Sequence, residues 1–254
     1  PSAGAGVKRD PRPRRLAAAA AVGCALAGWT IFAPVRLAEP RLVELPPGTS
    51  VRAIAATLRA AGLIRSAWAF VALAKLTRRP LRAGEYGFQR ASLWTVLRDI
   101  QSGRVYLHRV LVPEGDSIEQ VGATLARERL GDPARFRAAA ADARLLRGLG
   151  VPVASAEGYL FPDTYLLPKT MREDQIVAFM VRRFFDRVPR DLVARAAERG
   201  RKLHALVTFA SIVEKEARVA EERPVIAGVF ARRLAKGMPL QADPTVLYGL
   251  HRWD

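Results

Sequence analysis

The stretch LPPGTSVRAIAATLRAAGL at residues 45–63 recurs as VPEGDSIEQVGATLARERL at residues 112–130, aligned without gaps. Each copy begins with an apolar residue, continues with a Pro-x-Gly turn and a serine, and ends in an amphipathic run. A serine just before an apolar pattern with a 3.6-residue period is typical of a helix N-cap. Both copies therefore predict a strand, a turn and a capped helix.

The residues around the two copies predict further helices and strands. Apolar periodicity predicts helices at residues 66–76 and 93–100, whereas the runs at residues 82–88 and 105–112 are typical of strands. Beyond the second copy the pattern is helical, interrupted by an aromatic, Gly- and Pro-containing loop at residues 157–165. The whole pattern predicts an α+β fold, with a small mixed part followed by a mainly helical one.

The composition limits the classes of partner. The chain has 254 residues, of which 50% are hydrophobic, so it can bury one substantial core or two small ones. Its 41 Lys and Arg against 24 Asp and Glu give a net charge of +17. The arginines are spread along the chain and lack the interleaved aromatic residues of a single-strand nucleic-acid binder. We therefore expect no nucleic-acid partner, and anionic wall polymers and lipid head groups instead.

The N-terminal part joins a basic flank to an uncharged run. Residues 1–15 hold five basic side chains, and residues 16–35 hold no charged one. Twenty residues at 1.5 Å each are long enough to cross about 30 Å of hydrocarbon. We expect a transmembrane helix at 16–35 with residues 1–15 as a cytoplasmic tail, because basic flanks stay inside. A cleaved signal peptide is the alternative, since eight of the twenty residues are alanine.

Cysteine and histidine usage gives no sign of a metal or a cofactor. Cys24 is the only cysteine, and the three histidines are far apart in the sequence without ligand-like spacing. We expect no metal and no cofactor.

Two glutamates in an apolar helical pattern are the candidate catalytic residues. Taking 100° per residue, the apolar side chains of residues 206–220 gather on one side, with Glu216 at its edge and Lys215 on the opposite side. A carboxyl among apolar neighbours has a raised pKa, as a general acid requires. Glu214 points about 200° away from Glu216, so only one of them can serve, and Glu214 is the second choice. The alternative is that both are surface charges of an amphipathic helix.

A polar segment follows this helix. Gln241, Asp243 and Thr245 present amide, carboxylate and hydroxyl groups within five residues, and Pro244 biases Asp243 away from helix. These groups suit hydrogen bonds to sugar hydroxyls and acetamides. A plain turn around Asp243 is the alternative interpretation.

Three segments in this order carry a resemblance to a known family: EGYLFPDTY (157–165), ASIVEKE (210–216) and LQADPTVLYG (240–249). From about residue 42 onward the chain resembles the membrane-bound endolytic murein transglycosylases, or YceG-like family. The resemblance implies a LysM-like module at residues 43–110 and a lysozyme-like catalytic domain at residues 111–254 that lacks its C-terminal part.

The resemblance also implies an activity and partners. Members cleave peptidoglycan glycan strands between N-acetylmuramic acid and N-acetylglucosamine, leave a 1,6-anhydro end, and terminate the elongation of nascent strands. Peptidoglycan, the bacterial inner membrane and peptidoglycan synthases are the implied partners, with the catalytic domain in the periplasm. A membrane-anchored, non-catalytic peptidoglycan-binding scaffold is the alternative.

The resemblance places two sets of residues in the groove. Glu216 is the implied acid and base, with Glu214 as the fallback. The implied substrate-binding residues come from the two other segments: Glu157, Tyr159, Asp163, Tyr165, Gln241, Asp243, Thr245 and Tyr248.

Overall fold

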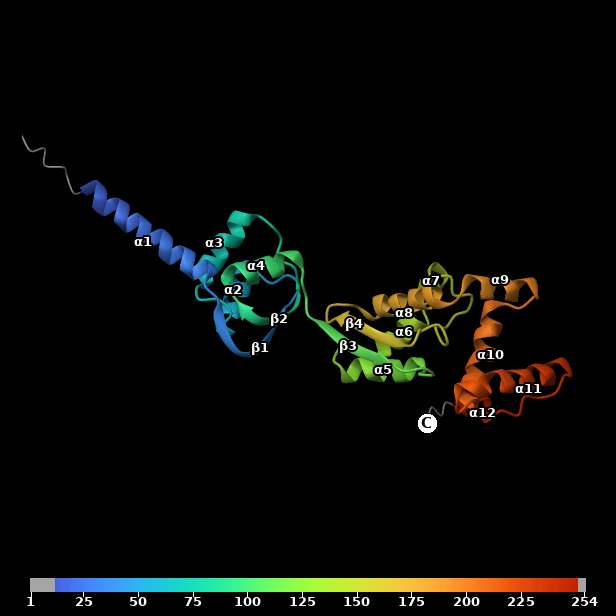
Figure 1. Ribbon diagram of the computed structural model, residues 1–254. Helices are drawn as coiled ribbons and strands as arrows, with labels where there is room; N and C mark the ends of the chain where they lie inside the picture. Colours follow the sequence, from blue (N-terminus) through green and yellow to red (C-terminus); the bar gives the residue numbers. More distant parts are fainter. Residues whose placement is uncertain (1–11, 251–254) are drawn as a thin grey trace, which may run out of the picture. The chain divides into compact units, whose positions relative to one another are not determined.

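The computed structural model describes the backbone of residues 12–250 and the side chains of residues 21–250. The chain divides into two compact units, residues 1–106 and residues 107–254, which are described separately (Figure 1). The predicted module of residues 43–110 thus overlaps the first unit and extends into the first strand of the second.

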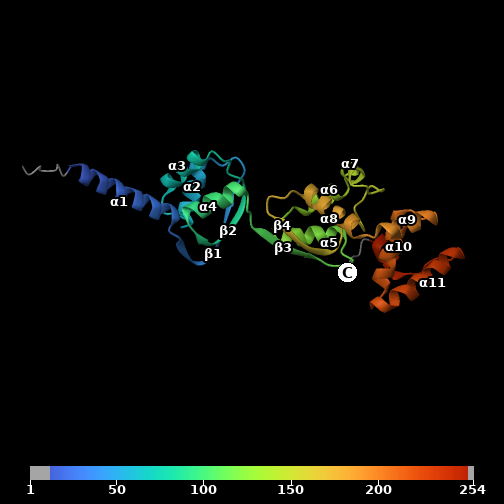
Figure 2. The same ribbon diagram turned by 45° about the horizontal axis from the view of Figure 1, so that its top comes forward.

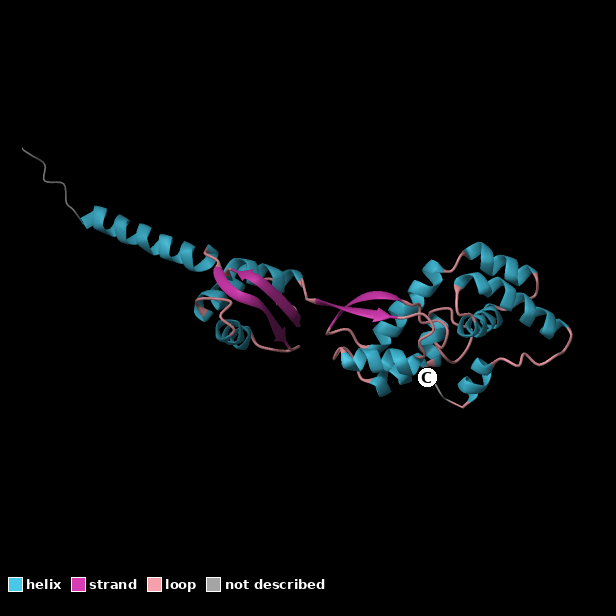
Figure 3. Cartoon of the chain, turned by 60° about the horizontal axis from the view of Figure 1, so that its bottom comes forward, coloured by secondary structure: helices cyan, strands magenta, loops and turns pink. Residues whose placement is uncertain are grey.

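The first unit is an antiparallel two-stranded sheet with helices on one face (Figure 3). Its elements are α1 (Arg12–Phe32), β1 (Val35–Leu45), α2 (Val51–Ala60), α3 (Ala67–Thr77), β2 (Gly84–Ala91) and α4 (Leu93–Ser102). Val43 and Leu45 on β1 and Tyr86 and Phe88 on β2 alternate with exposed neighbours and face the core. Such alternation is expected when helices cover only one face of a sheet.

The predicted membrane span of residues 16–35 overlaps α1, which ends at Phe32. The side chains of residues 16–20 lie outside the described part of the chain. Among the residues that were described, no helix combines the length and the apolar character needed to cross a membrane.

The second unit pairs a two-stranded sheet with a larger set of helices. Its elements are β3 (Leu107–Val112), α5 (Ile118–Arg127), α6 (Pro133–Ala140), α7 (Ala143–Gly148), β4 (Asp163–Pro168), α8 (Glu173–Arg187), α9 (Arg190–Glu198), α10 (Leu203–Glu216), η1 (Ala220–Glu222), α11 (Arg223–Ala235) and α12 (Asp243–Gly249). Strand β3 pairs antiparallel with β4, so that Val112 lies opposite Asp163. This pairing brings the turn after β3 close to the loop before β4.

The sequence repeat is also a repeat of structure. Gly48 and Gly115 have φ angles of 77° and 78°, in the left-handed region that favours glycine. Ser50 and Ser117 each accept a hydrogen bond from the backbone three residues on and cap α2 and α5. The predicted strand, turn and capped helix are therefore confirmed in both copies.

Two predicted boundaries are wrong. The helix that holds the glutamates ends at Glu216 rather than continuing to Ala220, and Ala217 is already extended. The Arg218 backbone N–H donates to the Glu222 carboxylate at 3.0 Å, a local bond that competes with further helix. Asp243, expected in a turn, instead begins α12, because Pro244 is well tolerated in a first helical turn.

Candidate functional site

Helix α10 packs against other parts of the protein on two of its sides. Glu214 and Glu216 lie on different sides of the helix. Leu203 and Val207 contact the main core of the second unit. Phe209, Ile212 and Val213 belong to a separate cluster with Phe230 of α11. Figure 2 shows α10 leading from α9 to α11. The expectation of a single apolar side was therefore too simple.

The register along α10 decides what each glutamate meets. Residues seven apart lie on the same side of a helix, so Glu214 follows Val207 and Glu216 follows Phe209. Glu214 is half-buried, whereas Glu216 ends the helix and is exposed. Burial raises the pKa of Glu214, the nearby Glu114 carboxylate raises it further, and Arg223 and Lys215 oppose the rise. The burial expected for Glu216 is thus found in part at the fallback residue, Glu214.

The turn between β3 and α5 meets the end of α10. A Cβ on Gly115 would lie 3.2 Å from both Cε and Nζ of Lys215, so the lysine side chain rests on this turn. Glu114 of the same turn pairs with Arg223 at 3.5 Å, between Oε2 and Nη2. The half-buried Glu214 is therefore next to a turn that carries the Glu114 carboxylate and is contacted by the Lys215 side chain.

Glu157 brings a second half-buried carboxyl to this region. Its Oε2 accepts a hydrogen bond from the Ile118 backbone N–H at 3.1 Å, at the start of α5. Burial raises the pKa of Glu157, the Ile118 hydrogen bond lowers it, Glu119 raises it, and Lys215 lowers it. A Cβ on the next residue, Gly158, would lie only 2.8 Å from Val207 of α10. The loop that carries Glu157 is thus held tightly against the helix that carries Glu214.

Lys215 links these acidic groups. Its positive charge acts on Glu214 and Glu157, and also on Asp116, whose pKa is raised by burial and lowered by Lys215 and Arg127. Tyr248 of α12 completes the region, since its pKa is raised by burial and then by Glu157 and Glu119. We call this group the carboxylate cluster: Glu114, Asp116, Glu119, Glu157 and Glu214, with Lys215, Arg223 and Tyr248.

The cluster does not have the geometry of a metal site. Within residues 21–250, no three His, Cys, Asp or Glu side chains are arranged to hold a metal ion. The cluster also includes two basic side chains, which compete with a cation for the carboxylates. Acid–base chemistry by a carboxyl of raised pKa suits this arrangement better.

Three of the implied substrate-binding residues have internal roles instead. Tyr159 and Tyr165 are 0% and 3% exposed, which leaves no surface for a substrate. The Tyr159 ring stacks on His204, and the Tyr165 hydroxyl donates to the Phe161 carbonyl. Asp163 forms an ion pair with Arg183 at 2.6 Å. A role of these three residues in substrate binding stays a prediction, and we leave them out of the candidate site because of these internal contacts.

The polar segment before α12 is partly engaged within the protein. The Gln241 Oε1 accepts from Arg233 at 2.9 Å, and the Thr245 hydroxyl donates to the Ala242 carbonyl at 2.7 Å. Asp243 is exposed in the first turn of α12. Asp243 and, within α12, Tyr248 are both exposed at the surface.

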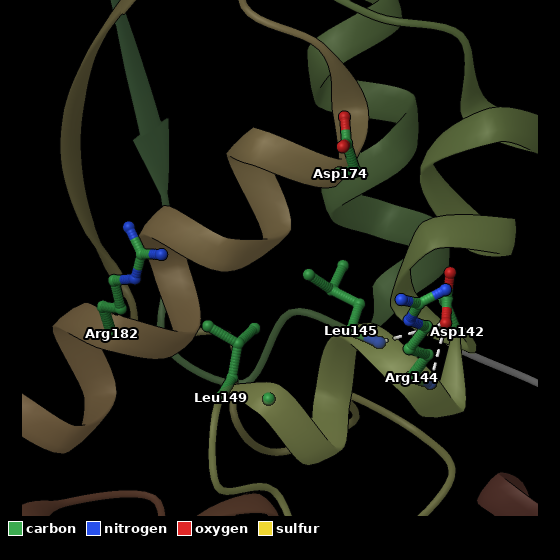
Figure 4. A pocket seen from close by; sticks show the side chains of 7 residues that line it. Asp142, Arg144, Leu145, Leu149, Asp174 and Arg182 are labelled. Carbon is green, nitrogen blue, oxygen red and sulfur yellow. Dashed lines mark hydrogen bonds between the residues drawn. The ribbon is translucent and has the colours of Figure 1, made fainter.

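A shallow, open hollow of about 420 Å³ lies elsewhere in the second unit (Figure 4). It is lined by Asp142, Arg144, Leu145, Gly148, Leu149, Asp174 and Arg182. Asp142 accepts from the Arg144 and Leu145 backbone N–H groups and caps α7, and Asp174 pairs with Arg172. The hollow holds no member of the carboxylate cluster, and both of its acidic side chains are engaged in these local contacts.

Three acids of the cluster were not predicted as site residues from the sequence: Glu114, Asp116 and Glu119. A signal was present in the repeat, because Pro47, Thr49 and Arg52 stand at the matching positions of the first copy. The second copy thus keeps the turn and cap but places three acids in the turn and first helical residues. That difference marks where the second copy meets the glutamate helix.

Fold and site together define an α+β protein whose second unit carries a half-buried carboxyl beside an acidic turn. Residues 43–254 match the YceG-like family, and the chain belongs to this family. An endolytic murein transglycosylase of Streptococcus pneumoniae serotype 2 is 30% identical over 234 residues, covering 81% of this chain and 42% of the relative. One of Bacillus subtilis strain 168 is 31% identical over 259 residues, covering 91% of this chain and 70% of that protein.

A solved structure agrees with the family. The crystal structure of a YceG-like protein from Listeria monocytogenes is 28% identical and aligns with a TM-score of 0.52, covering 84% of this chain and 75% of that one. The chain spans 42% of the length of the pneumococcal relative.

Proposed function

We propose that this chain carries the catalytic acid of an endolytic murein transglycosylase, and that Glu214 is this acid. The observation that carries the proposal is the half-burial and raised pKa of Glu214 on the ASIVEKE helix, beside the acidic turn. The names of the pneumococcal and B. subtilis relatives support the reaction class.

The proposed reaction needs one carboxyl that acts twice. Protonated Glu214 gives its proton to the oxygen between N-acetylmuramic acid and N-acetylglucosamine, the C1–O bond breaks, and the N-acetylglucosamine end leaves as an alcohol. The resulting carboxylate takes the proton of the muramoyl 6-hydroxyl, whose oxygen bonds to C1. The product is a 1,6-anhydro end, the acid is regenerated, and no water is consumed. A second carboxylate nucleophile is therefore not required, unlike in the usual glycoside hydrolase pair.

The surroundings supply what such an acid needs. Burial keeps the proton on Glu214 to higher pH, while Lys215 and Arg223 stabilise the carboxylate formed after proton transfer. Asp243 and Tyr248, with Glu157, remain the candidates for holding the sugar. A strand cut internally in this way would end its elongation.

The two glutamates of α10 provide a matched experiment. Glu214→Gln removes the proton donor and should lower the release of anhydro-ended glycans by at least about a hundredfold, the lower end of a general acid's contribution. Glu216→Gln changes the same chemical group at the exposed end of the same helix, and should retain most activity. Mass spectrometry of digested peptidoglycan gives the readout, because an anhydro end is lighter by one water than a hydrolysed end.

The possible outcomes separate the alternatives. Loss of activity in Glu216→Gln but not in Glu214→Gln would return the acid to Glu216. Hydrolysed ends would make the protein a hydrolase in which water attacks C1. Binding of peptidoglycan by both variants and wild type, with no product from any, would support a non-catalytic scaffold.

We also propose that the protein works at the bacterial inner membrane with its N-terminus in the cytoplasm and its second unit outside. The basic flank of residues 1–15 and the uncharged residues 16–35 support this topology. A protease added outside the membrane should digest the chain beyond residue 36. Protection of the second unit from this protease would refute the topology.

A further inference from the structure

Helix α3 of the first unit exposes an apolar stripe. Trp68 and Leu76 are 81% and 76% exposed, and Ala72 lies between them, so the three form one line at four-residue spacing. The other side of the helix is core, through Phe70 and Ala74. A tryptophan and a leucine exposed this far on one helix face form a surface that favours contact with something apolar.

Basic residues border this stripe, and acidic ones are absent around it. Residues 45–84 contain seven Lys and Arg and no Asp or Glu. Lys75 and Arg79 lie on the exposed side of α3 and just beyond its end, and Arg78 is also exposed. The acids of the unit lie on other elements. Glu44 and Glu85, for example, lie opposite each other in the register of β1 and β2, on the open face of the sheet. The helical side of the unit around α3 is therefore basic and apolar, whereas the strands carry charges of both signs.

The stripe begins beside the end of α1. Arg65, three residues before Trp68, donates to the Ala33 carbonyl and, at 3.0 Å, to the Pro34 carbonyl. Its guanidinium also lies 4.3 Å from the centre of the Trp29 ring. Figures 1 and 2 both show α3 close to the C-terminal end of α1. Three contacts from one arginine thus join α1 to the start of the stripe.

We propose that the exposed side of α3 docks on an anionic phospholipid surface. Trp68 and Leu76 enter the boundary between head groups and acyl chains, where tryptophan is favoured. Lys75, Arg78 and Arg79 contact the phosphates, and each basic residue near an anionic surface raises the affinity about fivefold. A lipid surface is favoured over a glycan strand for two reasons. The stripe combines apolar side chains that can insert between lipids with flanking basic side chains. It also has no acidic or amide side chains that could bind sugar hydroxyls. This docking holds whether or not α1 crosses the membrane, and it does not depend on the proposed activity.

A local probe tests the docking in the full chain. In a Cys24→Ser background, Ala72→Cys places an environment-sensitive fluorophore in the middle of the stripe. On vesicles that contain phosphatidylglycerol and acyl-brominated lipid, we expect blue-shifted emission and strong quenching. The matched control is Gln89→Cys, an exposed site on the open sheet face of the same unit. It should stay in water on the same vesicles.

Charge variants separate lipid docking from general attraction. Lys75→Glu with Arg79→Glu should weaken docking of the probe by at least about 25-fold, since each of the two basic residues is worth about fivefold. Arg190→Glu with Arg201→Glu makes the same change in net charge in the second unit and should have no effect.

Three results would overturn the proposal. The first is a probe at residue 72 that remains in water on anionic vesicles. The second is equal quenching on phosphatidylcholine alone or in the α3 charge variant. The third is shielding of the probe by peptidoglycan without lipid, which would assign the stripe to glycan.

Discussion

Lys215 lies directly against Gly115, so that a Cβ on the glycine would be 3.2 Å from the lysine Nζ. This contact joins the helix of the proposed acid to the acidic turn of the second sequence copy. The first copy has the same glycine, Gly48, with the same backbone conformation and nothing within 4 Å of its Cβ position.

Alanine at the two equivalent glycines should have unequal effects. Both Gly48→Ala and Gly115→Ala force a left-handed conformation on alanine, which costs about 1–2 kcal/mol of unfolding free energy. Only Gly115→Ala also displaces Lys215, and it should lower the rate of glycan cleavage by about tenfold. Denaturant unfolding and product release measure the two effects. Equal activity in the two variants would show that the Lys215 contact has no part in the reaction.

Gly158→Ala should move the Glu157 loop away from α10. The new Cβ would lie 2.8 Å from Val207 Cγ1, on a residue whose φ is 79°, so we expect a loss of about 1–3 kcal/mol in unfolding free energy. Adding Val207→Ala removes the steric clash. The double mutant should therefore lose less unfolding free energy than the sum of the losses in the two single variants. A strictly additive double mutant would contradict this account.

The stability of the protein should depend on pH through Glu214. Its pKa is raised above the ordinary glutamate value of 4.5, so the folded state binds more protons than the unfolded state in this range. The unfolding free energy contributed by this group is therefore highest below pH 4.5 and falls as pH rises through the raised pKa. Comparison of wild type with Glu214→Gln across pH isolates this effect. As pH rises, the unfolding free energy of the glutamine variant should increase relative to that of the wild type. A difference in unfolding free energy that does not change with pH would contradict the burial of Glu214.

Asp163 should titrate in the opposite sense. The Arg183 hydrogen bond and the Thr164 backbone N–H hold the pKa of Asp163 below its ordinary value of 3.8. The stability it contributes is present above pH 3.8 and is lost as pH falls through the lowered pKa. Asp163→Asn should lower the melting temperature at neutral pH and leave glycan cleavage intact at low temperature. A large loss of activity in the folded variant would return Asp163 to the substrate site.

The sequence by itself determined the local features of this protein. The Pro-x-Gly turns, the Ser50 and Ser117 caps and the strand-turn-helix repeat were all predicted, because a cap or a left-handed glycine depends on a few adjacent residues. The α+β class followed from these units, and the family from three short segments.

Only the tertiary structure shows that Glu214 is half-buried while Glu216 is exposed. Periodicity assigned one apolar side to α10, but the helix packs against the main core through Val207 and against α11 through Phe209. The pKa of a carboxyl depends on which of these surfaces covers it, and α10 ends at Glu216, which is exposed. Contacts between residues far apart in the sequence likewise bury Tyr159 and Tyr165. They also bring Glu157 to the start of α5, and no local sequence pattern specifies such contacts.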